Sequence, residues 1–231
     1  MARLAMLLLA FAGGAQAGSL VAPATEAVDG LSQAQLVERW WQWADRVPPG
    51  VRPYQDPTGA LCGLNQSGRV WFLAGTDGTA DVTRHCIVPA DTALFFPVIA
   101  MLSSAEPGKA ASCTQAVARA AANNAHLAQA DVRVDGELVP QVMQHRIATP
   151  RCFDAYPQAP YLSNAKVYYP AASDGYWLLL HPLAPGKHRI EVHARYANPG
   201  SDLGDLEQVF EYELQVGGPV PGSDAPLPDY I

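Results

Sequence analysis

Apolar residues near the start of the chain recur at helical spacing, and this pattern predicts an amphipathic helix over residues 32–47. The apolar stripe consists of Leu36, Trp40, Trp43 and Val47. Ser32 and Gln35 form a capping box, which satisfies backbone donors that are otherwise free at a helix start. The Pro-Pro-Gly sequence at 48–50 ends the helix.

After residue 66 the pattern changes to that of β-strands. Short apolar runs, bounded by glycine, proline and aspartate, occupy residues 70–73, 93–96 and 176–180. The segments 188–196 and 209–216 alternate apolar and polar residues, which is typical of antiparallel strands with one buried face. Asp-Gly at 135–136 predicts a hairpin within residues 132–139, because both central turn positions need positive φ.

One more helix interrupts the strands, with Ser112 and Gln115 as its capping box and an alanine-rich stretch that continues it to Ala128. Six or more short strands and two peripheral helices predict a mainly β fold, an antiparallel β-sandwich of immunoglobulin-like or jelly-roll-like type. The domain organisation that we expect is a flexible leader, a single β-rich domain and a proline-rich flexible tail, at residues 18–28, 29–216 and 217–231.

The first seventeen residues have the features of a cleavable signal peptide. Arg3 supplies a positive charge, a short apolar run follows, and Ala15 and Ala17 are the small residues that a signal peptidase reads. The apolar run is about half of the roughly 20 residues that a membrane-spanning helix needs. The sequence therefore predicts a secreted or periplasmic protein without an integral membrane segment.

The net charge restricts the expected binding partners, and the cysteines indicate the cellular compartment. The chain has 15 Lys and Arg against 22 Asp and Glu, so nucleic acid is not an expected partner. An even number of cysteines behind a signal peptide favours disulfides over free thiols. Of the three possible pairings we favour Cys62–Cys86 and Cys113–Cys152, because sequential pairing closes short loops; a zinc site is the alternative, but no C-x-x-C spacing supports it.

Candidate chemistry is sparse. The motifs H-E-x-x-H, G-x-x-x-x-G-K-[ST] and G-x-S-x-G are absent, and we predict no metal, no cofactor and no assigned catalytic residue. Asp154 and Asp174 lie in stretches rich in glycine, proline and serine. They are the carboxylate pair through which a hydrolase of an envelope polysaccharide would act.

Aromatic side chains outside the predicted core are better candidates for ligand contact. Trp41 falls off the apolar stripe of the first helix, and Tyr156 and Tyr161 follow Cys152 in a region punctuated by prolines. Flat rings beside polar groups hold sugars or peptides because they bury area at low entropic cost. Trp41, Tyr156, Tyr161 and Asp174 therefore form the predicted ligand-binding set.

Several stretches together resemble a group of uncharacterised secreted bacterial proteins. They are WWQWA at 40–44, CGLNQSGRVWFLAG at 62–75, RHCIVPADTALFFP at 84–97 and SDGYWLLLHPLAPGKH at 173–188. The resemblance covers most of residues 38–190. It implies export and a single domain, and it implies no activity and no catalytic residue.

These observations favour a non-catalytic binding module for a glycan or an envelope protein. The alternatives are the polysaccharide hydrolase with the carboxylate pair and a structural component of an assembly without a small ligand.

Overall fold

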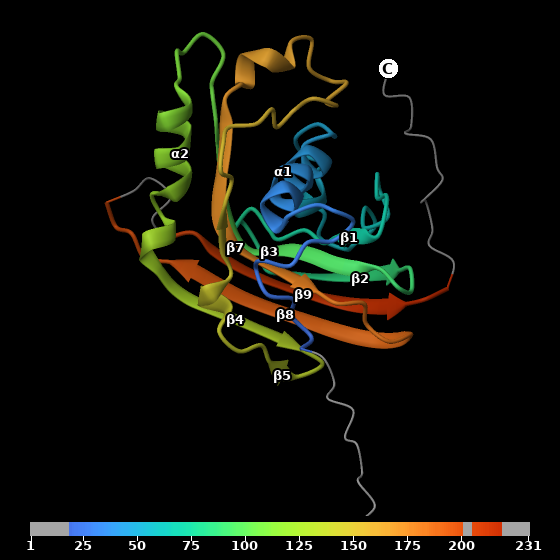
Figure 1. Ribbon diagram of the computed structural model, residues 1–231. Coiled ribbons are helices and arrows are strands. Elements are labelled where there is room, and N and C mark those ends of the chain that lie inside the picture. Colours follow the sequence, from blue (N-terminus) through green and yellow to red (C-terminus); the bar gives the residue numbers. More distant parts are fainter. Residues whose placement is uncertain (1–18, 201–204, 219–231) are drawn as a thin grey trace, which may run out of the picture.

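The computed structural model describes residues 19–200 and 205–218, and in these residues two mixed β-sheets pack face to face (Figure 1). The first sheet has the order β1 (Val70–Phe72), β3 (Ala93–Ser104), β7 (Ala171–Leu180), β6 (Arg146–Ala148). The second has the order β2 (Val82–Val88), β9 (Glu207–Val216), β8 (Gly186–Tyr196), β4 (Leu127–Val134), β5 (Glu137–Leu138). The helices are α1 (Gln33–Ala44) and α2 (Cys113–Ala121), with short 3-10 helices at Pro53–Gln55, Asn124–His126, Val142–Gln144 and Ala165–Tyr168.

This architecture confirms the predicted mainly β sandwich with two helices. Most neighbouring strands are antiparallel, whereas β1 with β3 and β2 with β9 are parallel pairs. The Asp-Gly hairpin between β4 and β5 is also confirmed, since Asp135 and Gly136 have φ of 53° and 85°.

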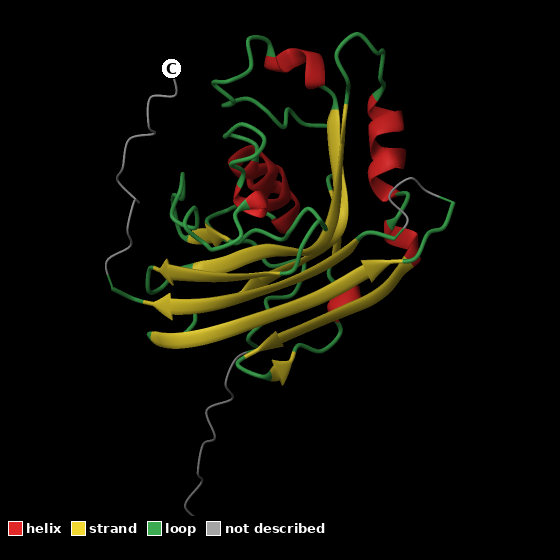
Figure 2. Ribbon diagram, turned by 180° about the vertical axis from the view of Figure 1, so that it is seen from behind, coloured by secondary structure: helices red, strands yellow, loops and turns green. Residues whose placement is uncertain are grey.

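The core has two layers of apolar side chains, one on each face of the first sheet. Strand β7 is buried at every position, and its side chains alternate between the layers. Leu178 and Leu180 point between the two sheets, whereas Trp177 and Leu179 pack in the layer that contains α1. Figure 2 shows α1 on one side of this sheet and the second sheet on the other. A strand covered on both faces reads as a continuous apolar run, as residues 176–180 do.

Three indole groups attach α1 to three separate segments. The N–H of Trp40 donates to the carbonyl of Leu73 (2.9 Å), and that of Trp43 donates to the carbonyl of Leu64 (2.7 Å). The N–H of Trp41 donates to the hydroxyl of Ser173 on β7 (2.8 Å). The predicted Ser32–Gln35 capping box is also formed and fixes the start of α1, while the three indole hydrogen bonds fix its orientation.

Both predicted disulfides are confirmed, Cys62–Cys86 and Cys113–Cys152. The second disulfide attaches the first residue of α2 to the segment before β7. The prediction that α2 continues to Ala128 was wrong, because the helix ends at Ala121 and Leu127 already begins β4. The buried Asn124 side chain donates to the carbonyls of Ala120 and Asp174 and accepts from the hydroxyl of Tyr196, so this polar network replaces the next helical turn.

The segment expected to be a flexible leader is instead attached to the sheet. The side chain of Ala22 is fully buried, and its backbone N–H donates to the carbonyl of Leu179 at 2.9 Å. The predicted signal peptide at 1–17 and residues 219–231 of the predicted tail lie outside the described residues. No helix within the described ranges is long and apolar enough to cross a membrane.

Candidate functional site

A cavity of about 390 Å³ lies between α1, the middle of β3, the start of β9 and four loops. This volume falls within the roughly 300–1,000 Å³ of small-molecule pockets. The walls combine aromatic and aliphatic side chains with a few polar groups: Trp40, Trp41, Asp45, Arg52, Tyr54, Gly75, Thr76, Asp77, Pro97, Ala100, Met101, Leu102, Tyr156, Leu206 and Gln208. An apolar pocket with a few convergent polar groups is the usual form of a ligand site.

Trp41 gives the cavity a rigid aromatic wall. Its ring packs edge-on against Trp40 with the centroids 4.8 Å apart and against Trp177 at 6.4 Å. Its N–H is held by Ser173, so the indole is fixed at both ends before any ligand arrives. Tyr156 lines the same cavity from the segment after Cys152 and packs against Tyr168. Fixed rings lose little conformational entropy when they bind a ligand.

The polar wall is a buried ion pair surrounded by phenol groups. Asp45, the residue directly after α1, is 1 % exposed, and its Oδ1 lies 3.0 Å from Nη1 of Arg52. Tyr54 accepts a hydrogen bond from the same nitrogen (2.6 Å) and donates to the same carboxylate oxygen (3.1 Å). Tyr161 accepts from Nη2 of Arg52 (3.1 Å) and donates to the backbone carbonyl of Asp45 (2.9 Å).

Burial shifts the acid–base properties of this wall. It raises the pKa of Asp45 from 3.8 to about 6, although the Arg52 guanidinium and the Tyr54 hydroxyl act in the opposite direction. Burial also raises the pKa of Tyr156 to about 12. The cavity therefore holds a carboxyl group that titrates close to neutrality beside phenols that remain hydrogen-bond donors. Such perturbed groups cluster at functional sites.

The raised pKa of Asp45 predicts a specific dependence of stability on pH. The folded protein holds the Asp45 proton more tightly than the unfolded chain, so the contribution of this group to stability falls as pH rises from about 4 through about 6. The unfolding free energy of the wild type minus that of Asp45→Asn should therefore decrease over this range by up to about 3 kcal/mol. Chemical denaturation at a series of pH values measures it.

Asp77→Asn is the matched control, because Asp77 lines the same cavity but is exposed. An equal decrease for Asp77→Asn would show that the pH dependence does not come from the burial of Asp45. An increase with pH for Asp45→Asn would mean that attraction to Arg52 outweighs burial, which would contradict the prediction.

The four predicted ligand-binding residues do not all lie at the cavity. Trp41 and Tyr156 line the cavity, and Tyr161 supports its polar wall from behind through Arg52. Asp174 does not line it, because neighbouring positions of β7 point to opposite faces and Ser173 takes the face toward α1. The carboxylate of Asp174 forms a two-point ion pair with Arg146, at 3.0 and 2.8 Å.

Asp154, the other member of the proposed carboxylate pair, is also absent from the cavity walls. Its Oδ1 accepts a hydrogen bond from the backbone N–H of Tyr156 (2.9 Å), and its backbone carbonyl accepts one from Gln42 of α1. Asp154 and Asp174 thus have separate structural partners.

Sequence reasoning missed Asp45, Arg52 and Tyr54. One signal was available: Asp45 follows Trp41 by four positions, so the two residues share a helix face. Arg52 and Tyr54 lie beyond the Pro-Pro-Gly stop, in a loop whose path no periodicity predicts.

In comparisons with known proteins, no family model matches the chain and no curated protein matches it significantly. Within the described residues, no group of three or more His, Cys, Asp or Glu side chains is arranged to hold a metal ion.

Proposed function

We propose that this protein is an exported binding module that receives a sugar residue of a glycan in the cavity beside α1. The observation that carries the proposal is the combination of fixed aromatic walls, Trp41 and Tyr156, with the buried Asp45–Arg52 pair in one cavity. Export is supported by the two disulfides, which persist in oxidising compartments, and by the sequence of the first seventeen residues.

A sugar suits this cavity because one face of a pyranose ring is apolar and its rim carries hydroxyl groups. The apolar face packs on an aromatic ring such as that of Trp41, and the hydroxyls need polar partners that point in fixed directions. Asp45 supplies one such partner: its Oδ1 accepts from Arg52 and Tyr54, whereas Oδ2 accepts no hydrogen bond from a described residue. Thr76 and Gln208 add further polar side chains to the walls of the cavity.

The test is glycan-array screening of the protein without residues 1–17, followed by calorimetric titration of the glycans that bind. We expect Tyr156→Ala to weaken binding by roughly tenfold, the usual effect of losing one aromatic stacking contact. Trp41→Phe should weaken binding less, because a smaller ring remains in place of the indole. Met143→Ala is the control, because Met143 is 63 % exposed and does not line the cavity. Its affinity should equal that of the wild type.

Two results would contradict the proposal. If no glycan binds, or if Tyr156→Ala and Trp41→Phe bind as tightly as the wild type while remaining folded, the cavity is not the glycan site. If incubation with a bound oligosaccharide releases new reducing ends, the protein is a hydrolase rather than a binding module.

A further inference from the structure

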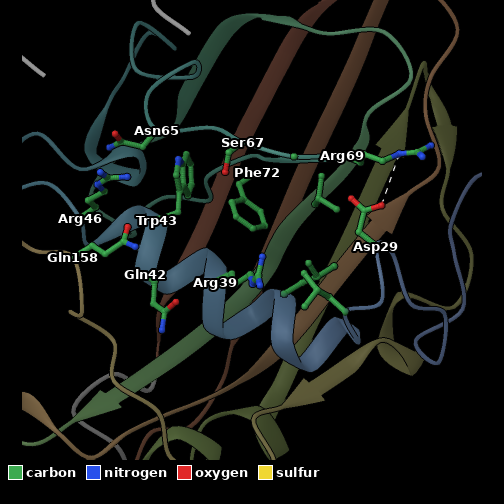
Figure 3. A pocket seen from close by; sticks show the side chains of 14 residues that line it. Asp29, Arg39, Gln42, Trp43, Arg46, Asn65, Ser67, Arg69, Phe72 and Gln158 are labelled. Atoms are coloured by element: carbon green, nitrogen blue, oxygen red, sulfur yellow. Dashed lines mark ion pairs between the residues drawn. The ribbon is translucent and has the colours of Figure 1, made fainter. Parts of the chain in front are cut away.

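A second concavity, of about 500 Å³, lies on a different face of α1 (Figure 3). Its floor contains the rings of Trp43 and Phe72, whose centroids are 5.7 Å apart. Arg39 belongs to α1, and Arg46 lies two residues beyond the end of this helix. Asn65 and Gln158 border the same groove. We call this concavity the arginine groove. None of its lining residues belongs to the walls of the cavity beside Asp45.

The arginine groove is a basic site in an acidic protein. The whole chain has a net charge of −7, yet three arginines line this groove against one acid, Asp29. Asp29 lies 3.9 Å from Arg69, and both side chains are exposed, so this pair contributes little. Arg39 and Arg46 form no ion pair with any residue in 19–200 or 205–218. Two guanidinium groups without an ion-pair partner among these residues, both lining one groove, favour an anionic ligand.

Other polar groups of the groove also retain unused hydrogen-bonding capacity. The side chains of Asn65, Ser67 and Gln158 make no hydrogen bond to another part of the described chain, and all three border the groove. Amides and guanidinium groups around an aromatic floor match a ligand that carries both hydroxyls and negative charges.

The edge of the first sheet argues against an acidic peptide bound as an added strand. Strand β1 is the terminal strand of that sheet and lies beside the groove. The side chain of Gln66 accepts a hydrogen bond from the N–H of Phe72 (3.0 Å) and donates one to its carbonyl (2.7 Å). Gln66 thus occupies both backbone groups of Phe72, through which an added strand would pair with this part of β1.

We infer that the arginine groove binds an anionic oligosaccharide, with Arg39 and Arg46 on its acidic groups and the partly exposed ring of Phe72 under a sugar ring. This inference goes beyond the proposed function, because it assigns a second site with a different charge preference. Carboxylated and sulfated sugars share this chemistry, and binding assays with each distinguish them.

The experiment is calorimetric titration of the protein, without residues 1–17, with four probes. They are a short oligogalacturonate, a heparin fragment, a neutral oligosaccharide of equal length and an acidic peptide of equal charge. We expect the oligogalacturonate or the heparin fragment to bind, and Arg39→Gln/Arg46→Gln to weaken that binding by roughly tenfold or more. The control is Arg119→Gln/Arg133→Gln, which changes net charge equally at exposed positions outside the groove and should leave binding unchanged.

Each other outcome overturns the inference. Absence of binding by both anionic sugars would exclude the site, and equal binding of the neutral sugar would exclude recognition of charge. Tighter binding of the acidic peptide would assign the groove to a protein partner. If the control variant Arg119→Gln/Arg133→Gln weakened binding equally, the anionic sugar would be attracted by the net charge of the protein and not by the groove. Tyr156→Ala should not affect this binding, so failure here is distinguishable from failure at the cavity beside Asp45.

Discussion

Reduction of both disulfides is expected to lower the free energy of unfolding by roughly 6 kcal/mol, since closing loops of this length contributes roughly 3 kcal/mol each. The bonds join residues 24 and 39 positions apart. Because a domain is typically stable by roughly 5–15 kcal/mol, this loss removes a large part of the total. Thermal melts with and without strong reductant measure it, and an unchanged melting temperature would contradict the expectation.

The two disulfides should not have the same local effect. Helix α2 packs through the small side chains of Ala116 and Ala120 against Ala172, so little apolar area holds it in place. Cys113→Ala/Cys152→Ala should therefore loosen α2 selectively, with faster amide hydrogen exchange there than in β8 or β9. Cys86 lies in the core between the sheets, and Cys62→Ala/Cys86→Ala serves as the comparison, with its effect centred on β2.

Replacement of Arg84 is expected to destabilise the fold by roughly 4 kcal/mol, because it removes several buried hydrogen bonds at once. Arg84 is 1 % exposed, and its guanidinium donates to the backbone carbonyls of Asp56, Ala74 and Gly75 and to the hydroxyl of Tyr212. Arg84→Met fills similar volume but removes the guanidinium donor to the carbonyls of Asp56 and Gly75, whereas the carbonyl of Ala74 still accepts from the hydroxyl of Tyr212. Denaturant titration of the variant measures the loss.

Arg84→Lys tests whether the shape of the guanidinium matters as well as its charge. A lysine ammonium is a single point of charge and cannot reach the carbonyl of Asp56 and those of Ala74 and Gly75 at the same time. Most of the destabilisation should therefore persist. Arg133→Met is the control, because Arg133 is exposed and donates only to the carbonyl of Gly136. It should change stability by less than about 0.5 kcal/mol. If Arg84→Met were equally mild, the buried hydrogen bonds would contribute far less than their number indicates.

Arg84 also explains why one strand was not predicted. In β2 the side chains of Val82, Arg84, Cys86 and Val88 point inward. An arginine at an inward position interrupts the apolar alternation by which strands are recognised. Its acceptors lie at residues 56, 74 and 75, and only the folded chain brings them around it.

Local patterns by themselves determined the mainly β class, the start of α1, the Asp135-Gly136 hairpin and the disulfide pairing. Each of these depends on interactions between residues that are near in sequence or on simple loop closure. The same patterns identified Trp41 and Tyr156 as ligand candidates, because an aromatic residue off the core stripe must pack elsewhere.

Only the tertiary structure decided which candidates share a cavity. Alternation along β7 sends Asp174 to the face away from α1, while the loop after α1 brings Arg52 and Tyr54 onto Asp45. Tertiary folding also buries Ala22 against the first sheet and brings Arg39, Arg46 and Asn65 around one groove. These arrangements join segments that are far apart in sequence. Contacts between such segments produce no periodic pattern of apolar and polar residues, so the sequence did not reveal them.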